Sequence, residues 1–578
     1  MNDDLSILRH SVSHILAYAL KEIDPHIELA IGPSIENGFY YDVKSNMVFS
    51  IEDFENIENK MKEIINKKLN FERIEMKSSE AISLFKSMNQ NFKVELIEDL
   101  NIDTVSLYKV GNFIDLCKGP HIANTSLIPV DSFKLTSVSG AYWRGDSSRD
   151  MLQRIYGTAW NSKSEMESYF KLLEEASLRD HRKLGEELGI FHVDEEAVGS
   201  IFWLRNGCVL FNTVKEQIIK ILKKYGYFLV QTPQLLNKNL WETSGHWDKF
   251  RENMFIVNDE DKIMAIKPMN CPGHIIIYRT GSIKSYRDLP VRMAEFGICH
   301  RNESSGSLHG LMRIRAFMQD DGHVFCTRDQ IISETEDTYA ALKELYALFG
   351  FSDITVKFSD RPEKRAGSDE VWDIAEQSLL KAADASGLEY TINKGEGAFY
   401  GPKLEFVLKD CLGRDWQCGT LQCDFVLPER FGIYYIDSAG EKQTPVMLHR
   451  ALVGSLERFI GILIEHYAGK FPFWLAPVQI AVASVTEEFA TYAKKIANLL
   501  TEADYRCILD ISNEKIGYKI RAHSTQKIPV IIIIGKKEEE NNTISIRQLS
   551  TNTTEEIPFS NVLTYFSKLH KESQSCFT

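Results

Sequence analysis

The chain lacks any long uninterrupted apolar segment. No stretch approaches the roughly 20 apolar residues that a membrane-spanning helix requires. The sequence begins Met-Asn-Asp-Asp, an acidic start without the apolar run of a secretory signal. Both absences argue against export and membrane insertion, and we expect a cytoplasmic protein that has no membrane partner.

Clustered cysteines and an excess of positive charge are also lacking. The ten cysteines are spread along the chain, which is typical of reduced thiols or metal ligands rather than of a disulfide framework. The net charge of −14 argues against indiscriminate binding of polyanions, so any contact with nucleic acid must use local basic patches. Internal repeats and low-complexity tracts are absent as well.

What the sequence does contain is enough apolar material for several hydrophobic cores. Of its 578 residues, 44% are hydrophobic and 26% are charged, which predicts a folded chain of three or more domains. The first region, up to about Trp160, mixes short strands and helices. Residues Ser164–Leu188 then predict one charged amphipathic helix suited to a connector, and we place a domain boundary near residue 178.

The middle region alternates helices with β-rich stretches. Examples are Tyr227–Thr232 and Phe425–Tyr435, which predict strands. A strand-dominated pattern of this kind indicates a mainly antiparallel sheet flanked by helices. We expect it to be the catalytic domain.

The pattern changes after the segment Phe471–Pro477. A strand over Val478–Val485, a helix over Glu487–Glu502 and a buried strand over Val530–Ile534 follow one another. This alternation predicts a small α/β domain with parallel strands.

Three soft metal ligands stand in distinctive phrases of the middle region. Cys271 lies in Met269–His274, His323 ends Gln319–His323, and His449 lies in Met447–Arg450. Taken alone, Cys271 is more often a buried thiol and each histidine a core residue. Taken with their phrases, they predict a zinc site in which one coordination position stays open to a substrate.

The segment Arg292–Phe325 predicts a long hairpin, because two apolar-rich arms enclose a polar loop. Within it, Arg301 has the planar fork that grips a phosphate and a carboxylate, Glu303 can accept from an adenine amino group, and Phe317 can stack on the base. Downstream, Gly454–Phe459 predicts a helix start that brings Arg458 to a terminal phosphate. Arginines without a Walker loop indicate a nucleotide site unlike a P-loop.

These residues resemble the class II aminoacyl-tRNA synthetases, with Arg301 and Glu303 matching the second signature of that class and Arg458 the third. The resemblance is greatest to the bacterial threonyl-tRNA synthetase family and covers nearly the whole chain. The phrases that carry it are Asp115–His121, Tyr142–Asp146, Met151–Trp160 and Trp416–Thr420.

The resemblance implies an α+β multidomain fold. Its parts are an α/β editing domain with a connecting helix (1–178), a class II catalytic domain with an antiparallel sheet flanked by helices (179–473) and a C-terminal α/β anticodon-binding domain (474–578). It implies a threonine–tRNA ligase that forms threonyl-adenylate from L-threonine and ATP with Mg²⁺ and charges tRNA(Thr).

The resemblance also assigns the residues of the active site. The implied zinc ligands are Cys271, His323 and His449, and Arg301 and Arg458 are catalytic. The implied ATP-binding residues are Arg301, Glu303, Arg313, Phe317, Gln417 and Arg458. The implied threonine-binding residues are Met269, Gln319, Asp321, Tyr400, Lys403 and Gln422.

Zinc explains how such a pocket rejects valine but not serine. Threonine offers an amine and a β-hydroxyl to the metal, whereas valine lacks the hydroxyl; recognition by shape alone would discriminate by only about 1 to 3 kcal/mol. Serine has both ligand groups, so a second, hydrolytic site is expected.

The first region contains residues suited to that second site. His10 and His14 are spaced i, i+4, which places them on one face of a helix, and Cys117 and His121 repeat the spacing. The quartet resembles the editing domain that deacylates seryl-tRNA in threonyl enzymes, and its metal is left open. Lys93 and Asp115 match further editing positions, which implies that they orient the ester and a water respectively.

The last region resembles the anticodon-binding domain shared by threonyl, prolyl, histidyl and glycyl enzymes. Asn513, Glu538 and Arg547 match the positions that read unstacked bases. The basic run expected after Arg547 is replaced by Gln548–Asn552. A phosphate-facing patch is predicted instead from Lys515, Lys519, Arg521 and Lys527.

The resemblance further implies a homodimer through Val230–Pro233, and a natural short form without the small ubiquitin-like domain that precedes the editing domain in many relatives.

The sequence also leaves other functions to consider. A synthetase-like binding or regulatory protein that senses uncharged tRNA would keep the fold, but intact Arg301, Glu303 and Arg458 argue against it. A free-standing deacylase would leave roughly 400 residues unexplained. Prolyl or seryl specificity is the alternative within the class, but proline offers no hydroxyl to a zinc.

Overall fold

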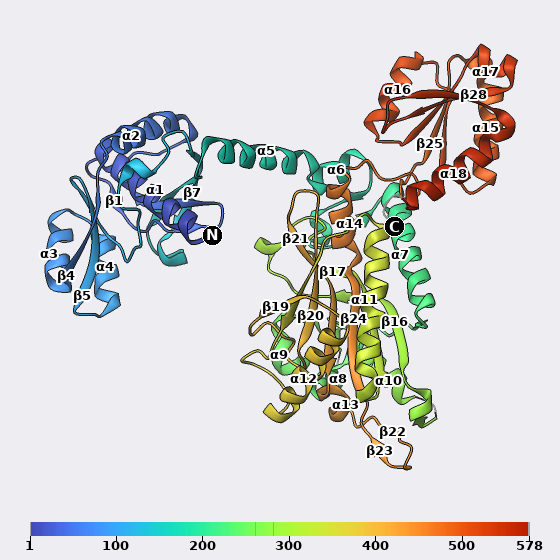
Figure 1. Ribbon diagram of the computed structural model, residues 1–578, viewed down its shortest axis with the longest axis horizontal. Coiled ribbons are helices and arrows are strands. Elements are labelled where there is room, and N and C mark those ends of the chain that lie inside the picture. Colours follow the sequence, from blue (N-terminus) through green and yellow to red (C-terminus); the bar gives the residue numbers. More distant parts are fainter. Residues whose placement is uncertain (1, 260–261, 281, 576–578) are drawn as a thin grey trace. The chain divides into compact units, whose positions relative to one another are not determined.

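The computed structural model describes residues 2–259, 262–280 and 282–575. The chain divides into two compact units, 1–175 and 176–578, which are described separately. Figure 1 shows α5 (Lys163–Arg179) as the helix that runs from one unit into the other. Within the described ranges, no helix is both long enough and apolar enough to cross a membrane.

The first unit begins with a 22-residue helix, α1 (Asn2–Ile23), and contains two antiparallel sheets. Leu8, Val12, Ile15 and Ala19 recur at helical spacing and are buried, so one face of α1 enters the core. The first sheet has the order β1–β3–β8–β7, with β2 beside β3: β1 (Glu28–Leu29), β2 (Ser34–Ile35), β3 (Gly38–Lys44), β7 (Phe133–Tyr142) and β8 (Met151–Ala159). The second comprises β4 (Phe71–Lys77), β5 (Thr104–Val110) and β6 (Phe113–Leu116). The remaining helices are α2 (Phe54–Asn66), α3 (Ser78–Ser87) and α4 (Asn91–Leu100).

The second unit is built on an eight-stranded sheet in the order β11–β16–β17–β24–β21–β20–β18–β19. The six central strands are antiparallel, and the two edge strands pair in parallel with their neighbours. The strands are β11 (Phe228–Leu229), β16 (Val291–His300), β17 (Ala316–Cys326), β18 (Ile354–Ser359), β19 (Tyr390–Asn393), β20 (Lys403–Lys409), β21 (Asp415–Asp424) and β24 (Val446–Ser455). The predicted antiparallel sheet is confirmed.

Helices cover this sheet and bury its apolar side chains. They are α7 (Arg205–Lys224), α11 (Ile331–Leu348), α12 (Asp369–Ala385) and α14 (Leu456–His466). The predicted helix start near Gly454 is confirmed, because the Ser455 hydroxyl accepts from the Arg458 backbone N–H at 3.2 Å and caps α14. Smaller elements at the sheet's margins are α8 (Lys238–Ser244), α9 (His246–Phe250), α10 (Cys271–Arg279), β12 (Leu235–Asn237), β13 (Ile256–Asp259), β14 (Lys262–Ile266), β15 (Lys284–Ser285) and β23 (Lys442–Gln443).

The C-terminal part of the second unit has its own five-stranded sheet, in the order β26–β25–β27–β28–β29. Three strands are parallel, as predicted, and two antiparallel strands extend the sheet. The strands are β25 (Ile480–Ser484), β26 (Cys507–Asp510), β27 (Val530–Ile534), β28 (Thr543–Gln548) and β29 (Thr554–Pro558). The helices are α15 (Ala490–Glu502), α16 (Ile516–Thr525), α17 (Lys536–Asn541) and α18 (Val562–Ser575).

Three local predictions were wrong. The connector is not one helix over Ser164–Leu188, because α5 ends at Arg179 and α6 (His181–Glu187) starts anew after Asp180, whose carboxylate accepts from the Arg182 backbone N–H at 2.8 Å. The stretch Phe425–Tyr435 is not a strand. It holds a short helix, α13 (Val426–Arg430), capped by Asp424, and only its last residue enters β22 (Tyr435–Ile436).

The third error concerns Cys117 and His121, which share the i, i+4 spacing of a helix. They lie instead in the irregular segment that follows β6. Their side chains converge because the loop folds back, and helical periodicity has no part in it.

A buried ion pair holds the centre of the eight-stranded sheet. Arg450 and Asp320 are each 1% exposed, and Arg450 Nη1 donates to Asp320 Oδ1 at 2.8 Å. The other carboxylate oxygen accepts from the backbone N–H groups of Leu452 (2.7 Å) and Val453 (3.0 Å). Both carboxylate oxygens of Asp320 are therefore satisfied at the point where the register of β17 and β24 shifts between Asp320 and Gly322, with the extra residues in β24.

Replacing Arg450 with methionine should leave this carboxylate buried and without its counter-ion. We expect Arg450→Met to reduce the unfolding free energy by about 3 to 5 kcal/mol. Differential scanning calorimetry would measure the shift of the second unit's unfolding transition. Lys224→Met, which breaks the exposed Lys224–Glu344 pair, is the control and should leave that transition almost unmoved. Equal shifts in both variants would contradict the role of the pair.

Candidate functional site

The predicted hairpin is present as β16 and β17, which pair from Val291↔Phe325 to His300↔Ala316. Side chains alternate along a strand, so Phe317, Gln319, Asp321 and His323 share one face of β17. On the other side of β17, His323 lies directly opposite His449 of β24. One strand therefore carries a continuous row of the predicted nucleotide, amino-acid and metal residues.

A pocket of about 420 Å³ opens at the far end of this row. All six residues predicted to bind ATP line it: Arg301, Glu303, Arg313, Phe317, Gln417 and Arg458. Gln319 and Gln422, predicted for the amino acid, line it as well. The structure thus brings all of the predicted nucleotide set and two of the six predicted threonine-binding residues to one cavity.

Within the pocket the charged groups hold one another in place. The Arg301 guanidinium lies over the Phe317 ring at 5.2 Å, and Arg313 forms an ion pair with Glu303 at 2.8 Å. Arg458 donates through Nε to the Met312 carbonyl at 3.0 Å. The arginine forks stay at fixed positions around the cavity, which is what recognition of a polyphosphate requires.

At the other end of the row, the ligand atoms of Cys271, His323 and His449 all lie within 4.8 Å of one another and are buried. Cys271 begins α10, while the two histidines face each other across β17 and β24, with His323 Nε2 at 2.9 Å from His449 Nδ1. A thiol and two imidazoles form the donor set that zinc prefers. The three residues therefore fit a zinc ion.

Outer partners hold both imidazoles in this orientation. His274 Nδ1 is 2.7 Å from His323 Nδ1, and Asp424 Oδ2 is 2.9 Å from His449 Nε2. Such contacts fix the nitrogen that each histidine turns toward a metal. Sequence reasoning missed both partners, although His274 ends the phrase in which Cys271 was recognised.

Burial disfavours the charged forms of His323 and Cys271. It lowers the pKa of His323 well below its ordinary value and raises the pKa of the Cys271 thiol well above its own. His323 is therefore ready as a neutral ligand, and a metal would displace the thiol proton of Cys271.

The predicted threonine-binding residues lie around the cluster. The Tyr400 ring stacks on His449 at 4.5 Å, and its hydroxyl donates to Gln422 Oε1 at 2.6 Å. Met269 Sδ is 3.2 Å from His246 Nε2, and Lys403 is paired with Glu405 at 2.6 Å. Lys403 is therefore already in an ion pair, whereas Tyr400, Gln422 and Met269 border the row.

Two of these residues have hydrogen-bonding capacity to spare. Asp321 accepts one bond from Asn270 at 3.0 Å, and Gln319 Oε1 is buried with no partner among the described residues. Buried polar atoms without partners are uncommon in native proteins. The row therefore offers unused acceptors between the nucleotide pocket and the metal ligands.

The first unit gathers the second predicted set. Ligand atoms of His10, His14, Cys117 and His121 lie within 4.8 Å of one another. The two histidines of α1 share a face, as predicted, and Cys117 Sγ is 3.4 Å from His10 Nε2 and 3.2 Å from His121 Nε2. Burial raises the pKa of Cys117 to about 11 and lowers that of His121 to about 2, so this set is also neutral.

Lys93 and Asp115 lie behind this quartet as a buried pair. Lys93 Nζ is 2.6 Å from Asp115 Oδ1, and His14 Nδ1 is 3.6 Å from Asp115 Oδ2. The Tyr41 hydroxyl donates to Asp115 and accepts from Lys93 at 3.0 Å. Tyr41 was not foreseen, because a tyrosine inside an apolar strand carries no mark of chemistry.

The predicted anticodon residues lie in the C-terminal sheet and its loops. Asn513 is exposed in the turn before α16, and Arg547 lies on β28, hydrogen-bonded to Asn552. Glu538, on α17, accepts from the Gly535 backbone N–H at 2.9 Å and from the Ser545 hydroxyl at 2.7 Å, so its carboxylate is already occupied.

One member of the predicted phosphate patch was wrong. Lys519 is only 1% exposed, and its ammonium donates to the Ser484 carbonyl at 2.9 Å and the Asp510 carbonyl at 3.3 Å. Its position on the inner face of α16 turns it away from solvent. Lys515 and Arg521 are exposed, and Lys527 is partly exposed.

Comparisons with known families agree with this arrangement. Residues 254–467 match the class II tRNA synthetase core domain (G, H, P, S and T), 479–569 the anticodon binding domain, and 105–156 the second additional domain of threonyl and alanyl tRNA synthetases. The chain is 55% identical over 562 residues to the threonine–tRNA ligase of Ehrlichia canis (strain Jake), covering 97% of this chain and 88% of the relative. It is 53% identical over 562 residues to that of Rickettsia bellii (strain OSU 85-389), with the same coverage.

Solved structures are similar as well. The RNA binding domain of threonyl-tRNA synthetase from Cryptosporidium parvum Iowa II aligns with a TM-score of 0.65 at 39% identity, covering 68% of this chain and 98% of that one. Prolyl-tRNA synthetase from Cryptosporidium parvum aligns with a TM-score of 0.54 at 16% identity over 69% of this chain and 76% of that one, which shows a shared fold alone.

Near-complete coverage at more than half identity, together with matches to a class II core, an editing-type domain and an anticodon-type domain, leads to one conclusion. The chain belongs to the bacterial threonyl-tRNA synthetase (threonine–tRNA ligase) family of class II.

Proposed function

We propose that the protein activates L-threonine with ATP, transfers the threonyl group to tRNA(Thr), selects threonine with a zinc ion and hydrolyses mischarged seryl-tRNA(Thr). The observation that carries this proposal is the row on β17. It joins a nucleotide-sized pocket lined by Arg301 and Arg458 to the cluster of Cys271, His323 and His449. The carboxylate of a threonine bound along the row would lie next to the α-phosphate of ATP at the point where the pocket and the cluster adjoin.

Activation on this surface needs position and charge more than a protein nucleophile. Arg301 would neutralise the α-phosphate and the attacking carboxylate, Arg458 the terminal phosphates, with Mg²⁺ accompanying ATP. Phe317 offers a face to the adenine ring, and Glu303 would accept from its amino group. Because Arg313 already pairs with Glu303, the two side chains would adjust together as the base enters.

Selection would depend on the buried donor set. Zinc held by Cys271, His323 and His449 would supply an open coordination position to which the amine and β-hydroxyl of threonine, but not valine, can both bind. Asp321 would accept from the substrate ammonium, since its carboxylate has spare acceptor capacity. Tyr400 and Gln422, joined by a 2.6 Å hydrogen bond, would bound the pocket around the methyl group.

Editing would use the neutral quartet of the first unit. His14 borders Asp115 at 3.6 Å, so together they can orient a water and take its proton. Lys93 is 2% exposed and bound to Asp115, which favours a role in holding that carboxylate over direct contact with the ester.

tRNA recognition is proposed to use the C-terminal domain, through Asn513, Glu538 and Arg547. The domain division at residues 178 and 473 and the homodimer stay predictions. Phe228 and Leu229, just before Val230–Pro233, are 48% and 45% exposed on an edge strand, which suits the proposed dimer interface.

Amino-acid-dependent exchange of pyrophosphate into ATP tests activation. We expect strong exchange with threonine, exchange with serine roughly 10- to 200-fold weaker, and exchange with valine weaker by roughly 10⁴-fold or more. A zinc chelator should abolish the threonine signal, and added zinc should restore it. Metal-replete, folded protein without any exchange would refute the proposal and favour a binding or deacylase role.

The metal content of a ligand variant tests zinc binding independently of activity. We expect about one zinc per wild-type chain and a loss of nearly all of it in Cys271→Ser, because a hydroxyl is a far poorer zinc ligand than a thiolate. Atomic absorption after dialysis would measure this. Cys208→Ser alters an exposed cysteine and should keep the metal; equal zinc in both variants would rule out the assigned ligands.

Hydrolysis of preformed seryl-tRNA(Thr) tests the second site. His14→Ala should slow deacylation by roughly 10²-fold or more, because it removes the proposed general base, while threonine-dependent exchange stays intact. His26→Ala, which alters an exposed histidine of the same unit, is the matched control. Unchanged deacylation in His14→Ala would remove the quartet from the mechanism.

A further inference from the structure

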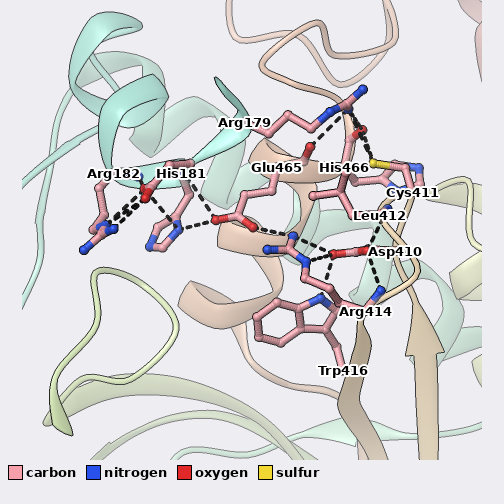
Figure 2. A network of polar contacts seen from close by, with 11 residues as sticks. Arg179, His181, Arg182, Asp410, Cys411, Leu412, Arg414, Trp416, Glu465 and His466 are labelled. Carbon is pink, nitrogen blue, oxygen red and sulfur yellow. Dashed lines mark hydrogen bonds and ion pairs between the residues drawn. The ribbon is translucent and has the colours of Figure 1, made fainter. Parts of the chain in front are cut away.

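A buried histidine lies where the connector helix breaks. α5 ends at Arg179, Asp180 caps the next helix, and His181 is the first residue of α6. The His181 side chain is fully buried, and Figure 2 shows it pointing toward Glu465 near the end of α14. None of the reactions described above requires a histidine here.

Both ring nitrogens of His181 have partners. Nδ1 is 2.7 Å from Glu465 Oε1, and Nε2 is 3.0 Å from the backbone nitrogen of Leu311. A backbone N–H can only donate, so Nε2 is the acceptor. Nδ1 therefore carries the proton and donates a hydrogen bond to Glu465. The imidazole therefore links the carboxylate of Glu465 on α14 to the backbone N–H of Leu311.

The partners of Glu465 make this arrangement rigid. Its second oxygen accepts from Arg414 Nη2 at 2.5 Å, and Arg414 also donates to Asp410, which accepts from the Trp416 indole at 2.9 Å (Figure 2). Asp180, His181 and Glu465 lie close enough for a cation. However, both imidazole nitrogens are in use, and arginines already neutralise the carboxylates, so the arrangement is one of positioning.

The turn held by His181 is fitted closely to it. Gly310 has φ +49°, and a Cβ there would lie 2.2 Å from His181 Nε2, so only glycine allows this approach. A Cβ on Gly461 of α14 would meet Leu311 Cβ at 3.2 Å, so the helix also receives the turn closely. Arg458, at the start of α14, donates to the Met312 carbonyl. α14 thus holds residues 311 and 312 from both of its ends, at one end through His181.

This turn forms part of the nucleotide pocket. Met312, Arg313 and Ile314 line the cavity, and Arg313 pairs there with Glu303. We propose that His181 is a positioning residue for ATP. It fixes the 310–313 turn against α14 and so presents Arg313 and Glu303 to the nucleotide. The inference rests on the proposed function. Among the described residues, the hydrogen bonds and ring contacts of His181 involve none of those that bound the amino-acid pocket.

Two substitutions separate the two hydrogen bonds of the imidazole. A glutamine side-chain oxygen reaches about as far as Nε2 and can accept from Leu311, whereas an asparagine reaches only the position of Nδ1. In His181→Asn, the buried Leu311 N–H loses its partner. We expect the KM for ATP to rise roughly 10-fold in His181→Asn and to stay near the wild-type value in His181→Gln.

Pyrophosphate exchange with varied ATP and varied threonine gives the decisive comparison, and calorimetric titration of ATP provides a readout independent of turnover. The KM for threonine should hardly change in either variant. His466→Gln, at the end of α14 and away from the turn, is the control and should behave as wild type. Should His181→Asn fail to fold, Gly310→Ala displaces the same turn and should raise the KM for ATP selectively.

The outcomes separate this inference from the proposed function. Absence of exchange in the wild type would refute the function itself. An active wild type with an unchanged ATP KM in His181→Asn, or with ATP and threonine KM values raised together in the asparagine and glutamine variants, would overturn the positioning role. A selective effect on ATP in the asparagine variant alone would establish it.

Discussion

The pairing of β17 with β24 is the constraint on which the catalytic unit depends. His323 and His449 stand directly opposite each other only in this register, and the bulge between Asp320 and Gly322 shifts the alternation next to them. A slip by one residue would turn the row on β17 to the opposite face of the sheet. The buried Asp320–Arg450 pair fixes the register at the bulge. Gly322 is required beside it, since a Cβ there would come within 2.3 Å of the Arg450 guanidinium.

A second buried network orients one of the proposed metal ligands, His323. Burial alone would raise the pKa of Glu295, but hydrogen bonds from His274, Thr232 and Lys267 outweigh it and lower that pKa to about 2. Glu295 therefore stays ionised and orients His274, whose Nδ1 meets His323. Thr232 belongs to the segment predicted to form a dimer interface. The orientation of His323, a proposed metal ligand, is thus linked through His274, Glu295 and Thr232 to that edge of the sheet.

Patterns of residues with local causes were predictable, and contacts across the fold were not. The hairpin of β16 and β17 and the start of α14 follow from periodicity and capping, which short segments carry by themselves. The break at Asp180 could not be foreseen, because the helical pattern continues through it while the aspartate caps a new helix. The stretch Phe425–Tyr435 has strand-like composition, yet the Asp424 carboxylate receives the N–H groups of Val426 and Leu427 and starts a helix.

The candidate sites divide along the same line. The ligands Cys271, His323 and His449 stood out as residue types in phrases, whereas His274, Asp424, Tyr41 and His181 act through a partner that only the tertiary structure supplies. Lys519 shows the converse error: a lysine in a basic stretch predicts a solvent-facing charge, but three acceptors at residues 484 and 510 draw it inward. Sequence reports which groups are present, and packing decides which of their atoms remain available.

The two histidine-rich clusters differ in a way that bears on metal binding. In the second unit, Asp424 binds the outer nitrogen of His449 directly at 2.9 Å, which leaves Nδ1 turned inward, where the proposed zinc would need it. In the first unit, the nearest carboxylate, Asp115, is 3.6 Å from His14 and is already neutralised by Lys93 at 2.6 Å and hydrogen-bonded to Tyr41. Lys93 and Tyr41 therefore already compensate most of the Asp115 charge, and little of it acts on the imidazoles. The arrangement in the second unit favours a tightly held cation. The arrangement in the first unit favours a neutral, hydrogen-bonding surface on which a water can be oriented.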